Sequence, residues 1–324
     1  MSVRRSVIRG TGSYLPERVM TNEEMSKLVE TSDEWIRERT GIIERHIAAD
    51  DQLTSDLGVE AAQRALHAAG MTIDQVDLIV VATTTPDKTF PATATAVQAK
   101  LGSAHGAAFD VQAVCSGFLF ALATADSLLK SGVFNGALVI GAETFTRILD
   151  WSDRGTCVLF GDGAGAVAMT AEPAEEAGDR GILAHYLRTD GAKTNLLHVD
   201  GGVSSTGTVG HVRMLGNQVF RHAVTNISSA VEVVMQEAEI TADDVDWFVP
   251  HQANQRILNG VAKKLRLDED KVISTVAMHA NTSAASIPLA LDTAVGDGRI
   301  KPGHLILSEA MGGGLSWGAS LFRL

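Results

Sequence analysis

The two halves of this chain contain similar segments in the same order. Residues 71–77 (MTIDQVD) lead into the apolar run 78–82, and residues 240–246 (ITADDVD) lead into the run 247–250. A helix-like stretch precedes each pair, over residues 59–69 and 223–237. Chance similarity is the alternative, because a helix followed by an apolar strand is common in α/β proteins. The shared order favours an internal duplication.

A second pair of segments extends the correspondence. Cys115 begins an apolar helix of small residues that ends near Ser131, and Asn281 begins a similar helix that ends near Asp297. The two separations are equal. The apolar strands that follow are residues 137–140 and 304–307. Cys115 and Asn281 therefore occupy equivalent positions in the two halves.

The alternation of strands and helices predicts an α/β fold with mainly buried sheets. At 324 residues the chain exceeds the usual size of one domain. The acidic, turn-rich stretch 171–180 marks the boundary, so we expect one half over residues 1–172 and another over residues 173–324. Two related halves would face each other around one active site. The Gly/Ser-rich region 190–210 reads as a mobile loop near a site entrance.

Composition excludes several classes of protein. The net charge of -12 disfavours general nucleic-acid binding, because a negative field repels phosphates. No apolar run approaches the roughly 20 residues of a membrane span. Arg4 and Arg5 are followed by Arg9 and a Gly-Thr-Gly-Ser stretch instead of an apolar signal core, which indicates a cytoplasmic protein.

Only Cys115 and Cys157 are present, too few for a disulfide framework and without the spacing of a metal site. Residues 109–126 look like a strand, a tight elbow and a buried helix that begins at Cys115. A thiol at a helix N-terminus is favoured as the thiolate, which makes Cys115 a candidate nucleophile. The alternative is a small buried packing residue, which suits Cys157 in the strand-like run 156–160.

Two polar residues are candidate partners of Cys115. His251 comes just after the end of a predicted strand, where α/β folds place functional groups, and could act as a base or as a neutral hydrogen-bond donor. Asn281 is alternatively a helix N-cap. The combination of the three residues at matching elbows and a strand end favours a catalytic site.

Five motifs, one of which contains His251, together with the segments around Cys115 and Asn281, make the chain resemble a β-ketoacyl-[acyl-carrier-protein] synthase III of the thiolase-fold superfamily. The motifs are residues 32–36 (SDEWI), 39–41 (RTG), 160–166 (FGDGAGA), 250–254 (PHQAN) and 312–318 (GGGLSWG). The resemblance covers essentially the whole chain. It implies a duplicated αβαβα layered fold with two pseudo-symmetric halves, a Cys/His/Asn triad and a homodimer. The implied substrates are an acyl-CoA primer, most simply acetyl-CoA, and malonyl-acyl-carrier protein.

The resemblance assigns catalytic roles in this decarboxylative condensation, which would initiate fatty acid synthesis. Cys115 would attack the acyl-CoA thioester and hold the acyl group. Backbone N–H groups of Cys115 and Gly313 would stabilise the oxyanion, although the Gly run at 312–314 is alternatively a simple tight turn. His251 and the Asn281 amide would donate to the enolate formed when malonyl thioester loses carbon dioxide. No tightly bound cofactor and no metal are implied, since the coenzyme A thioester is a substrate.

Residues that bind coenzyme A also follow from the resemblance. Trp35 and Arg154 would sandwich the adenine, and Arg39 would meet the phosphates. Gly216 and Asn254 would line the pantetheine channel. Without the family, Trp35 would read as a core aromatic and the arginines as members of exposed ion pairs.

The same resemblance predicts how the protein meets its partners. Gln252, Arg256, Lys263 and Lys264, with Arg221 nearby, would form a docking patch for the acidic carrier protein. A solvated helical face is the ordinary alternative. Phe90 would reach across the dimer interface and limit the primer pocket of the partner.

Several other functions share part of this sequence pattern. A papain-like cysteine hydrolase shares the chain order Cys, His, Asn. This chain lacks the sequence signature that surrounds the nucleophile of those enzymes, and its duplicated halves also argue against that function. Residues 161–166 could be a dinucleotide loop, yet the run 167–170 looks like a strand where a helix is required. An acyl-binding protein without catalysis, a thiolase and a hydroxymethylglutaryl-CoA synthase fit the triad poorly. A condensing enzyme of a specialised pathway stays open.

Overall fold

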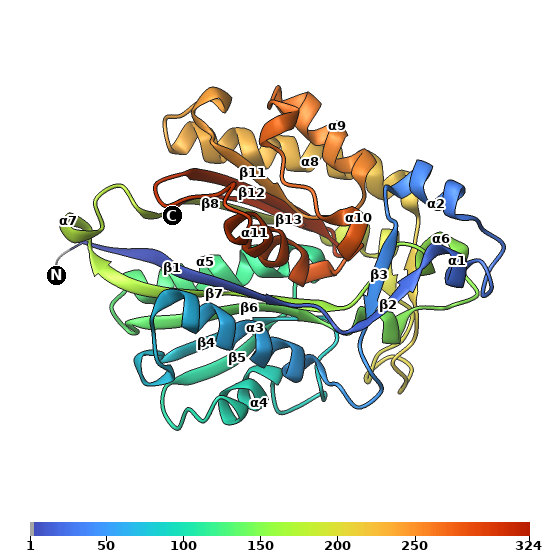
Figure 1. Cartoon of the computed structure of the whole chain (residues 1–324), viewed down its shortest axis with the longest axis horizontal. Helices are drawn as coiled ribbons and strands as arrows, with labels where there is room; N and C mark the ends of the chain where they lie inside the picture. Colours follow the sequence, from blue (N-terminus) through green and yellow to red (C-terminus); the bar gives the residue numbers. More distant parts are fainter. Residues whose placement is uncertain (1–2) are drawn as a thin grey trace.

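Two β-sheets lie one above the other in the computed structural model, which describes residues 3–324 (Figure 1). The first sheet has the order β1 (Arg4–Tyr14), β7 (Gly163–Pro173), β6 (Gly136–Glu143), β4 (Leu78–Ala82) and β5 (Ala107–Val111). The second has the order β11 (Trp247–Pro250), β12 (Leu305–Gly312), β13 (Ser316–Arg323) and β8 (Gly181–Thr189).

The strands of the two sheets pair in the same way. β4 is parallel to β6, while β6 with β7 and β7 with β1 are antiparallel. In the second sheet β11 is parallel to β12, while β12 with β13 and β13 with β8 are antiparallel. β5 is parallel to β4 at the edge of the first sheet. At the equivalent place in the second sheet, Val272 forms an isolated parallel bridge with Phe248 of β11. The pairing confirms the duplication that the sequence predicts.

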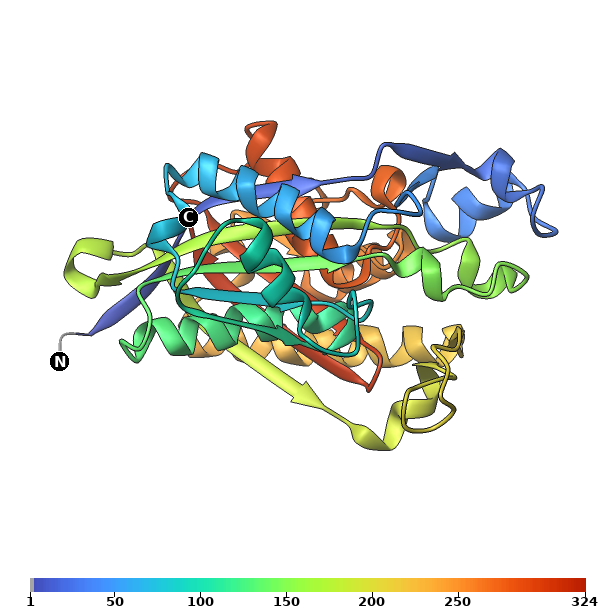
Figure 2. The same ribbon diagram turned by 90° about the horizontal axis from the view of Figure 1, so that it is seen from below.

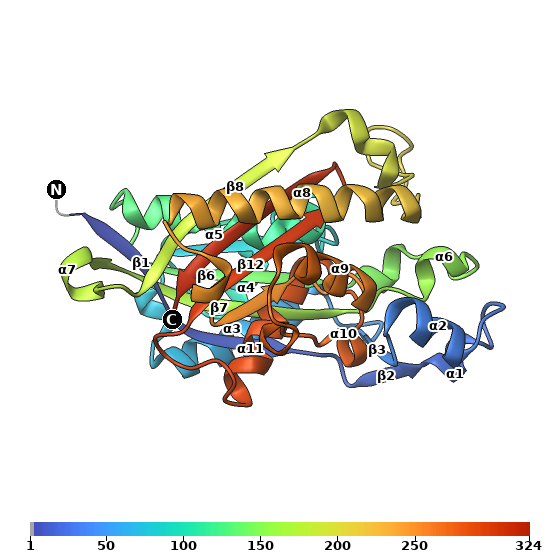
Figure 3. The ribbon, with the colours of Figure 1, turned by 90° about the horizontal axis from the view of Figure 1, so that it is seen from above.

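Helices form three layers around these sheets. The central layer, between the sheets, holds α5 (Gly117–Lys130) and α11 (Ser286–Gly296). The outer helices of the first sheet are α3 (Thr54–Ala69) and α4 (Thr93–Lys100). The outer helices of the second sheet are α8 (Gly216–Glu237) and α9 (Gln255–Leu265). Views from below and above show α3 and α4 on one side and α8 and α9 on the other (Figure 2, Figure 3). The predicted α/β fold of duplicated αβαβα layers is therefore confirmed.

Glycines let the central helix α11 lie directly on the first sheet. A Cβ on Gly141 of β6 would come within 2.2 Å of the Ala284 carbonyl oxygen, and one on Gly165 of β7 within 2.6 Å of the Leu289 nitrogen. No side chain larger than hydrogen fits such spacing without a shift of the helix. The two halves are thus in contact where α11 begins.

The helices and turns of the repeat have the predicted type in the structure, but the helices are longer than predicted. The 3₁₀ turns η1 (Ile73–Gln75) and η5 (Ala242–Asp244) occupy equivalent places, and each has a capping box, at Thr72 and Thr241. α3 and α8 begin five and seven residues earlier than the predicted helices, at Thr54 and Gly216. The β7 strand confirms that residues 161–166 are not followed by the helix of a dinucleotide loop.

The prediction of a strand around Cys157 was wrong. Cys157 ends the short helix α6 (Arg154–Cys157), whose first turn forms because the Asp153 side chain accepts a hydrogen bond from the Gly155 N–H. The side chain of Cys157 is nonetheless fully buried, as expected for a packing residue.

The remaining elements surround the two sheets. At the right of Figure 1 lie β2 (Arg18–Thr21), β3 (Glu44–Ile47), α1 (Asn22–Met25), α2 (Asp33–Thr40), α6 and α10 (Val276–His279). The region predicted as a loop contains η4 (Gly191–Leu196) and β9 (Leu197–Val199), which pairs with β10 (Val212–Met214). The other short elements are η2 (Val114–Ser116), η3 (Phe145–Ile148), α7 (Ala174–Ala177), η6 (Glu269–Lys271) and η7 (Ser283–Ala285). Across residues 3–324 no helix has the length and apolar character needed to cross a membrane.

Candidate active site

Cys115 and Asn281 lie at equivalent elbows. Cys115 is in the 3₁₀ turn η2 that precedes α5, and Asn281 comes just before the turn η7 that precedes α11. The residue before each has a positive φ, 50° at Val114 and 56° at Ala280. Such backbone is unusual for non-glycine residues and is common at functional turns. The helix proper starts at Gly117 rather than at Cys115, because the 3₁₀ turn comes first.

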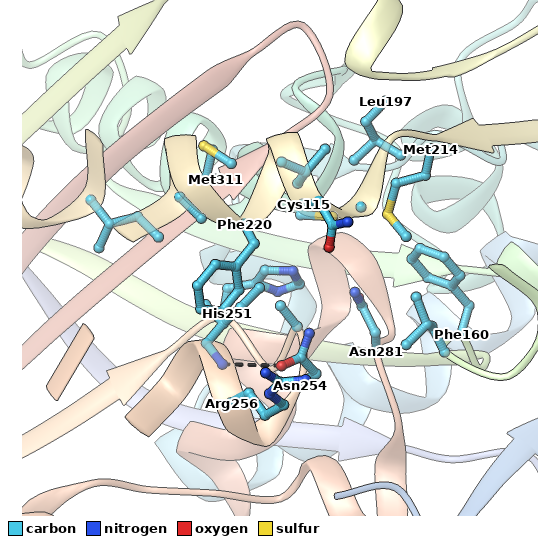
Figure 4. Close-up of a pocket in the computed structure, with 18 of the residues that line it drawn as sticks. Cys115, Phe160, Leu197, Met214, Phe220, His251, Asn254, Arg256, Asn281 and Met311 are labelled. Atoms are coloured by element: carbon cyan, nitrogen blue, oxygen red, sulfur yellow. Dashed lines mark hydrogen bonds between the residues drawn. The ribbon is translucent and has the colours of Figure 1, made fainter. Parts of the chain in front are cut away.

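The three triad candidates meet in one cavity of about 250 Å³ (Figure 4). Cys115, His251 and Asn281 are 3%, 5% and 6% exposed, and each contributes to its wall. Arg39, Gly216, Asn254 and Arg256, predicted to contact coenzyme A or the carrier protein, line the same cavity. The structure thus brings together residues from both halves and from α2, α8 and α9.

The side chain of Asn281 is oriented by its own backbone turn. Its Oδ1 accepts a hydrogen bond of 2.9 Å from the Ser283 N–H. Its backbone is also fixed, since the N–H donates to the Leu159 carbonyl and the carbonyl accepts from Gly161. With Oδ1 engaged, the amide NH₂ is the part left to donate to a bound group.

His251 is a buried neutral imidazole. Its Nδ1 lies 2.6 Å from Ser286 Oγ, which also accepts a hydrogen bond of 3.3 Å from the Gln252 N–H. When the Ser286 hydroxyl donates to Nδ1, the proton of the neutral imidazole is on Nε2. Burial lowers the pKa of His251 to about 3. His251 can therefore donate a hydrogen bond near neutral pH without carrying charge.

The expectation of a Cys115 thiolate was wrong for the substrate-free protein. Burial, with a further contribution from the negative charge of Glu143, raises the pKa of Cys115 to about 12. The position near a helix start favours the thiolate, but the cost of placing a charge in this buried setting is larger. At neutral pH the side chain is a thiol, so its proton must leave as the sulfur attacks.

The glycine run at residues 312–314 packs against the nucleophile. A Cβ on Gly312 would lie 2.6 Å from the Cys115 nitrogen, and Ser316 ties the run to the elbow through hydrogen bonds to the Gly313 and Ala113 carbonyls, of 3.0 and 3.1 Å. Gly313 and Gly314 line a second cavity, of about 550 Å³. Apolar side chains that include Phe120, Phe145 and Ile148 line that cavity too.

Trp35 lies half-buried between two arginines. The guanidinium carbons of Arg39 and Arg154 are 4.5 and 4.8 Å from the centre of its ring. Arg154 also donates a hydrogen bond of 2.7 Å to the Glu30 carbonyl oxygen. Arg39 is the member of this cluster that reaches the catalytic cavity, so the cluster lies beside its mouth.

The prediction that Gln252 docks the carrier protein was wrong. Gln252 is fully buried, and its side chain bonds the carbonyls of Pro250 and Ile273 and the N–H of Thr275. With its amide engaged on both sides, Gln252 holds the turn after β11 and cannot meet a partner.

The other predicted contact residues lie on the surface. Arg256, Lys263 and Lys264 on α9 are exposed, as is Arg221 on the neighbouring α8. Phe90 is 82% exposed in the segment between β4 and α4. Their contacts with a carrier protein or a partner subunit stay predictions.

Two residues of the site were missed in the sequence. Ser286 bonds the catalytic imidazole candidate, and Glu309 lines the cavity although it belongs to strand β12. A lone acidic residue within an otherwise apolar strand was the available signal for Glu309. Nothing in the pattern distinguishes Ser286 from the hydroxyl residues around it. No cluster of three or more His, Cys, Asp or Glu side chains suited to a metal ion occurs within residues 3–324.

Comparisons with known proteins agree with this geometry. The family models described as 3-oxoacyl-[acyl-carrier-protein (ACP)] synthase III and its C-terminal part match residues 109–191 and 235–324. The chain is 72% identical over 321 residues to β-ketoacyl-[acyl-carrier-protein] synthase III of Hyphomonas neptunium, with 99% of each chain covered. It is 64% identical to the same enzyme of Caulobacter vibrioides, covering 99% of this chain and 100% of that one.

Solved structures resemble the chain over its whole length. The 3-oxoacyl-[acyl-carrier-protein] synthase III of Aquifex aeolicus has a TM-score of 0.93 at 46% identity, covering 98% of this chain and 100% of that one. The priming β-ketosynthase of the R1128 polyketide pathway has a TM-score of 0.94 at 35% identity, covering 100% and 97%.

Proposed function

Because the chain belongs to the 3-oxoacyl-[acyl-carrier-protein] synthase III family, we propose that it initiates fatty acid synthesis by decarboxylative condensation of a short acyl-CoA, most simply acetyl-CoA, with malonyl-acyl-carrier protein. The observation that carries the proposal is the meeting of the Cys115 thiol with two uncharged donors, His251 and Asn281, in one buried cavity.

In the first half-reaction Cys115 Sγ bonds to the carbonyl carbon of the acyl-CoA, and the bond from that carbon to the coenzyme A sulfur breaks. The proton of the Cys115 thiol ends on the released coenzyme A thiol, so no charge is left in the buried site. The backbone N–H groups of Cys115 and Gly313 stabilise the oxyanion, a type of contact worth about 3 kcal/mol. The second cavity, which Gly313 also lines, receives the acyl chain against Phe120, Phe145 and Ile148.

In the second half-reaction the malonyl thioester takes the place of coenzyme A beside His251 and Asn281. The bond to the carboxylate carbon breaks, carbon dioxide leaves, and the electron pair forms an enolate. Nε2–H of His251 and the NH₂ of Asn281 donate to the enolate oxygen. The enolate carbon then attacks the acyl carbonyl and the bond to Cys115 Sγ breaks. The sulfur takes up one proton from solvent, which replaces the proton that left with coenzyme A.

The arrangement of the two donors disfavours a hydrolase. In cysteine hydrolases with a Cys/His/Asn set, the asparagine orients the histidine that deprotonates the nucleophile. Here Asn281 Oδ1 bonds the Ser283 N–H, and His251 Nδ1 is 2.6 Å from Ser286 Oγ instead. Asn281 and His251 are therefore oriented separately, as two donors to one oxygen require.

The substrates reach this cavity through a channel lined by Gly216 and Asn254, with the coenzyme A adenine between Trp35 and Arg154 and its phosphates near Arg39. The guanidinium carbons of Arg39 and Arg154 lie 4.5 and 4.8 Å from the centre of the Trp35 ring, so both can reach a stacked base. Arg154 must move off the ring for the adenine to enter, because 4.8 Å leaves no room between the two groups. Arg256, Lys263 and Lys264 with Arg221 form a basic patch for the acidic carrier protein. The protein works in the cytoplasm as a homodimer, in which Phe90 of one protomer limits the primer cavity of the other.

A second candidate is priming of a specialised pathway. The likeness to a priming β-ketosynthase from a polyketide pathway favours this alternative for the acyl donor and the carrier, while the chemistry at Cys115 is the same. A panel of acyl-CoAs with fatty acid and polyketide carrier proteins separates the two by relative kcat/KM.

The acyl-enzyme is tested by mixing the protein with acyl-CoAs and measuring intact mass and the modified peptide. We expect an adduct on Cys115 that is absent in C115A. A folded wild-type protein that acquires no adduct from any acyl-CoA would disprove the mechanism.

The donor pair is tested with H251A and N281A. Both variants are expected to lose condensation by about 100-fold or more, as for other oxyanion donors, and to be impaired much less in acylation. Normal condensation in either variant would show that its side chain is not a donor to the enolate.

A further inference from the structure

The duplication places a buried glutamate behind each elbow. Glu143 follows Cys115 by 28 residues, and Glu309 follows Asn281 by 28 residues. The two lie on the equivalent strands β6 and β12, and their exposed fractions are 0% and 1%. The two halves therefore carry carboxyl groups at matching positions, so differences between them reflect what each half does.

The two carboxyl groups have opposite surroundings. Glu143 accepts hydrogen bonds from the Thr84 N–H at 3.1 Å, the Thr84 hydroxyl at 2.9 Å and the Thr85 hydroxyl at 2.6 Å. Glu309 Oε2 is buried and has no hydrogen-bond partner among the described residues. The Glu309 side chain instead lines the cavity that holds Cys115 and His251. Its backbone is fixed, since its carbonyl accepts a hydrogen bond of 2.8 Å from the His251 N–H.

Glu309 is uncharged at neutral pH. The other titratable residues that line the cavity are Cys115 and His251, both neutral, with Arg39 and Arg256. The buried residues that α8 and α11 contribute carry no charge. On the neighbouring strands, the residues paired with Glu309 are Ala319 of β13 and Pro250 of β11, which carry no charge. Burial accordingly raises the pKa of Glu309 to about 8. Glu309 therefore has an O–H to donate and needs a partner.

The position of Glu309 fits one end of the extender. The primer chain has no group that requires a donor, and Glu309 does not line the second cavity. The enolate oxygen already has His251 and Asn281. Besides the amides of the pantetheine arm, which pass Gly216 and Asn254, the polar group of the extender that enters this cavity is the free carboxylate of the malonyl thioester.

We propose that Glu309 is a further catalytic residue, which as a neutral acid donates its O–H to the malonyl carboxylate and orients the bond that breaks on decarboxylation. The inference rests on the proposed function. Glu309 keeps its proton throughout, while the electron pair of the broken bond passes to the enolate and carbon dioxide leaves. An ionised Glu309 would repel the malonyl carboxylate at close range, so condensation should fail when Glu309 loses its proton.

The test compares E309Q with E309M. Glutamine keeps a hydrogen-bond donor and cannot ionise, whereas methionine has a similar length but neither a donor nor an ionisable group. Acyl-enzyme is formed first, and its single-turnover condensation with malonyl-acyl-carrier protein is followed from pH 6 to pH 10. Wild type should lose condensation as pH rises through about 8, and E309Q should lack that decline. E309M should condense at least tenfold more slowly than E309Q at pH 7. A matched control is E60Q, which removes an exposed carboxylate on α3 and should show the wild-type profile.

Results with either variant could overturn the proposal. One is an alkaline decline in E309Q equal to that of wild type. The other is an E309M variant that condenses as fast as E309Q, or that loses acylation of Cys115 as strongly as condensation, since Glu309 would then have only a structural role. An infrared difference spectrum of wild type against E309Q supplies a readout besides activity, because a protonated carboxyl band should disappear as pH rises. If wild-type Cys115 were never acylated, the proposed function itself would fail instead.

Discussion

At the scale of single residues, Cys115, His251 and Glu309 are uncharged at neutral pH, although Arg39 and Arg256 line the same cavity. Cys115 and Glu309 have raised pKa values and His251 a lowered one, in each case chiefly because burial disfavours the charged form. The sequence identified Cys115, His251 and Asn281 by their positions relative to helix and strand ends. It could not indicate their charge states, because these depend on how completely distant segments cover them.

Alkylation of Cys115 should report its high pKa. We expect the rate of modification by iodoacetamide to rise about tenfold per pH unit between pH 7 and pH 10, because only the thiolate reacts. Mass spectrometry of the Cys115 peptide measures the rate, and C115A shows any contribution from Cys157. A plateau below pH 9 would mean that the thiolate forms far more easily than this burial allows.

Ser286 is expected to set the orientation and the proton position of His251. Replacement of its hydroxyl in S286A removes the 2.6 Å contact to Nδ1 and should slow condensation by about tenfold, the effect of one hydrogen bond of about 1.4 kcal/mol. S286T keeps a hydroxyl and should recover much of the rate. If S286A and S286T were equally slow with unchanged thermal unfolding, the hydroxyl would not be the group that matters.

At the scale of elements, the strands β4, β6, β11 and β12 and the two central helices were predictable because each half repeats the same apolar pattern. The order of the strands comes from the structure. The beginnings of α3 and α8 were not, since Thr54 and Gly216 lie in polar stretches that become helical through packing on the sheets. The helix containing Cys157 was also missed, because a single turn capped by Asp153 has no periodic pattern to detect. The burial of Gln252 depends on the Ile273 and Thr275 segment, which lies far from it in the sequence.

The close contact of α11 with the first sheet predicts different effects of two alanine substitutions. G141A should lower the free energy of unfolding by about 1 to 3 kcal/mol, since its Cβ would meet the Ala284 carbonyl at 2.2 Å. G296A lies at the end of the same helix with open space around it, and should leave stability unchanged or raise it by about 0.5 kcal/mol. Denaturant unfolding measures both, and equal values would show that the helix can shift at no cost.

At the scale of the whole molecule, each half supplies a different part of the chemistry. The first sheet and α5 present the nucleophile, while the second half presents both donors and Glu309. The duplication in the sequence was sufficient to predict that two halves face each other. It could not predict the depth of the cavity or the shape of the primer pocket, which depend on segments such as η4 and β9 that have no counterpart in the repeat.

The proposed role of Phe90 in the neighbouring protomer can be tested with mixed dimers. F90A is expected to accept longer acyl-CoA primers than wild type, because the side chain that is 82% exposed in one protomer would no longer fill the partner's cavity. In a dimer of F90A with C115A, the active Cys115 lies on the F90A chain and meets the intact Phe90 of the other chain. The narrow primer range should therefore return, and a range as broad as that of F90A alone would place Phe90 in its own protomer's site.

The contact between α11 and the first sheet also has a consequence for how the chain becomes active as it folds. Cys115 and Asn281 approach each other only when segments separated by half of the chain have docked, and contacts between such distant segments are slow to form. Each layer can acquire its secondary structure earlier without any cavity for a thioester. In a refolding experiment we therefore expect enzymatic activity to appear with the slowest kinetic phase, well after the circular dichroism signal of the helices.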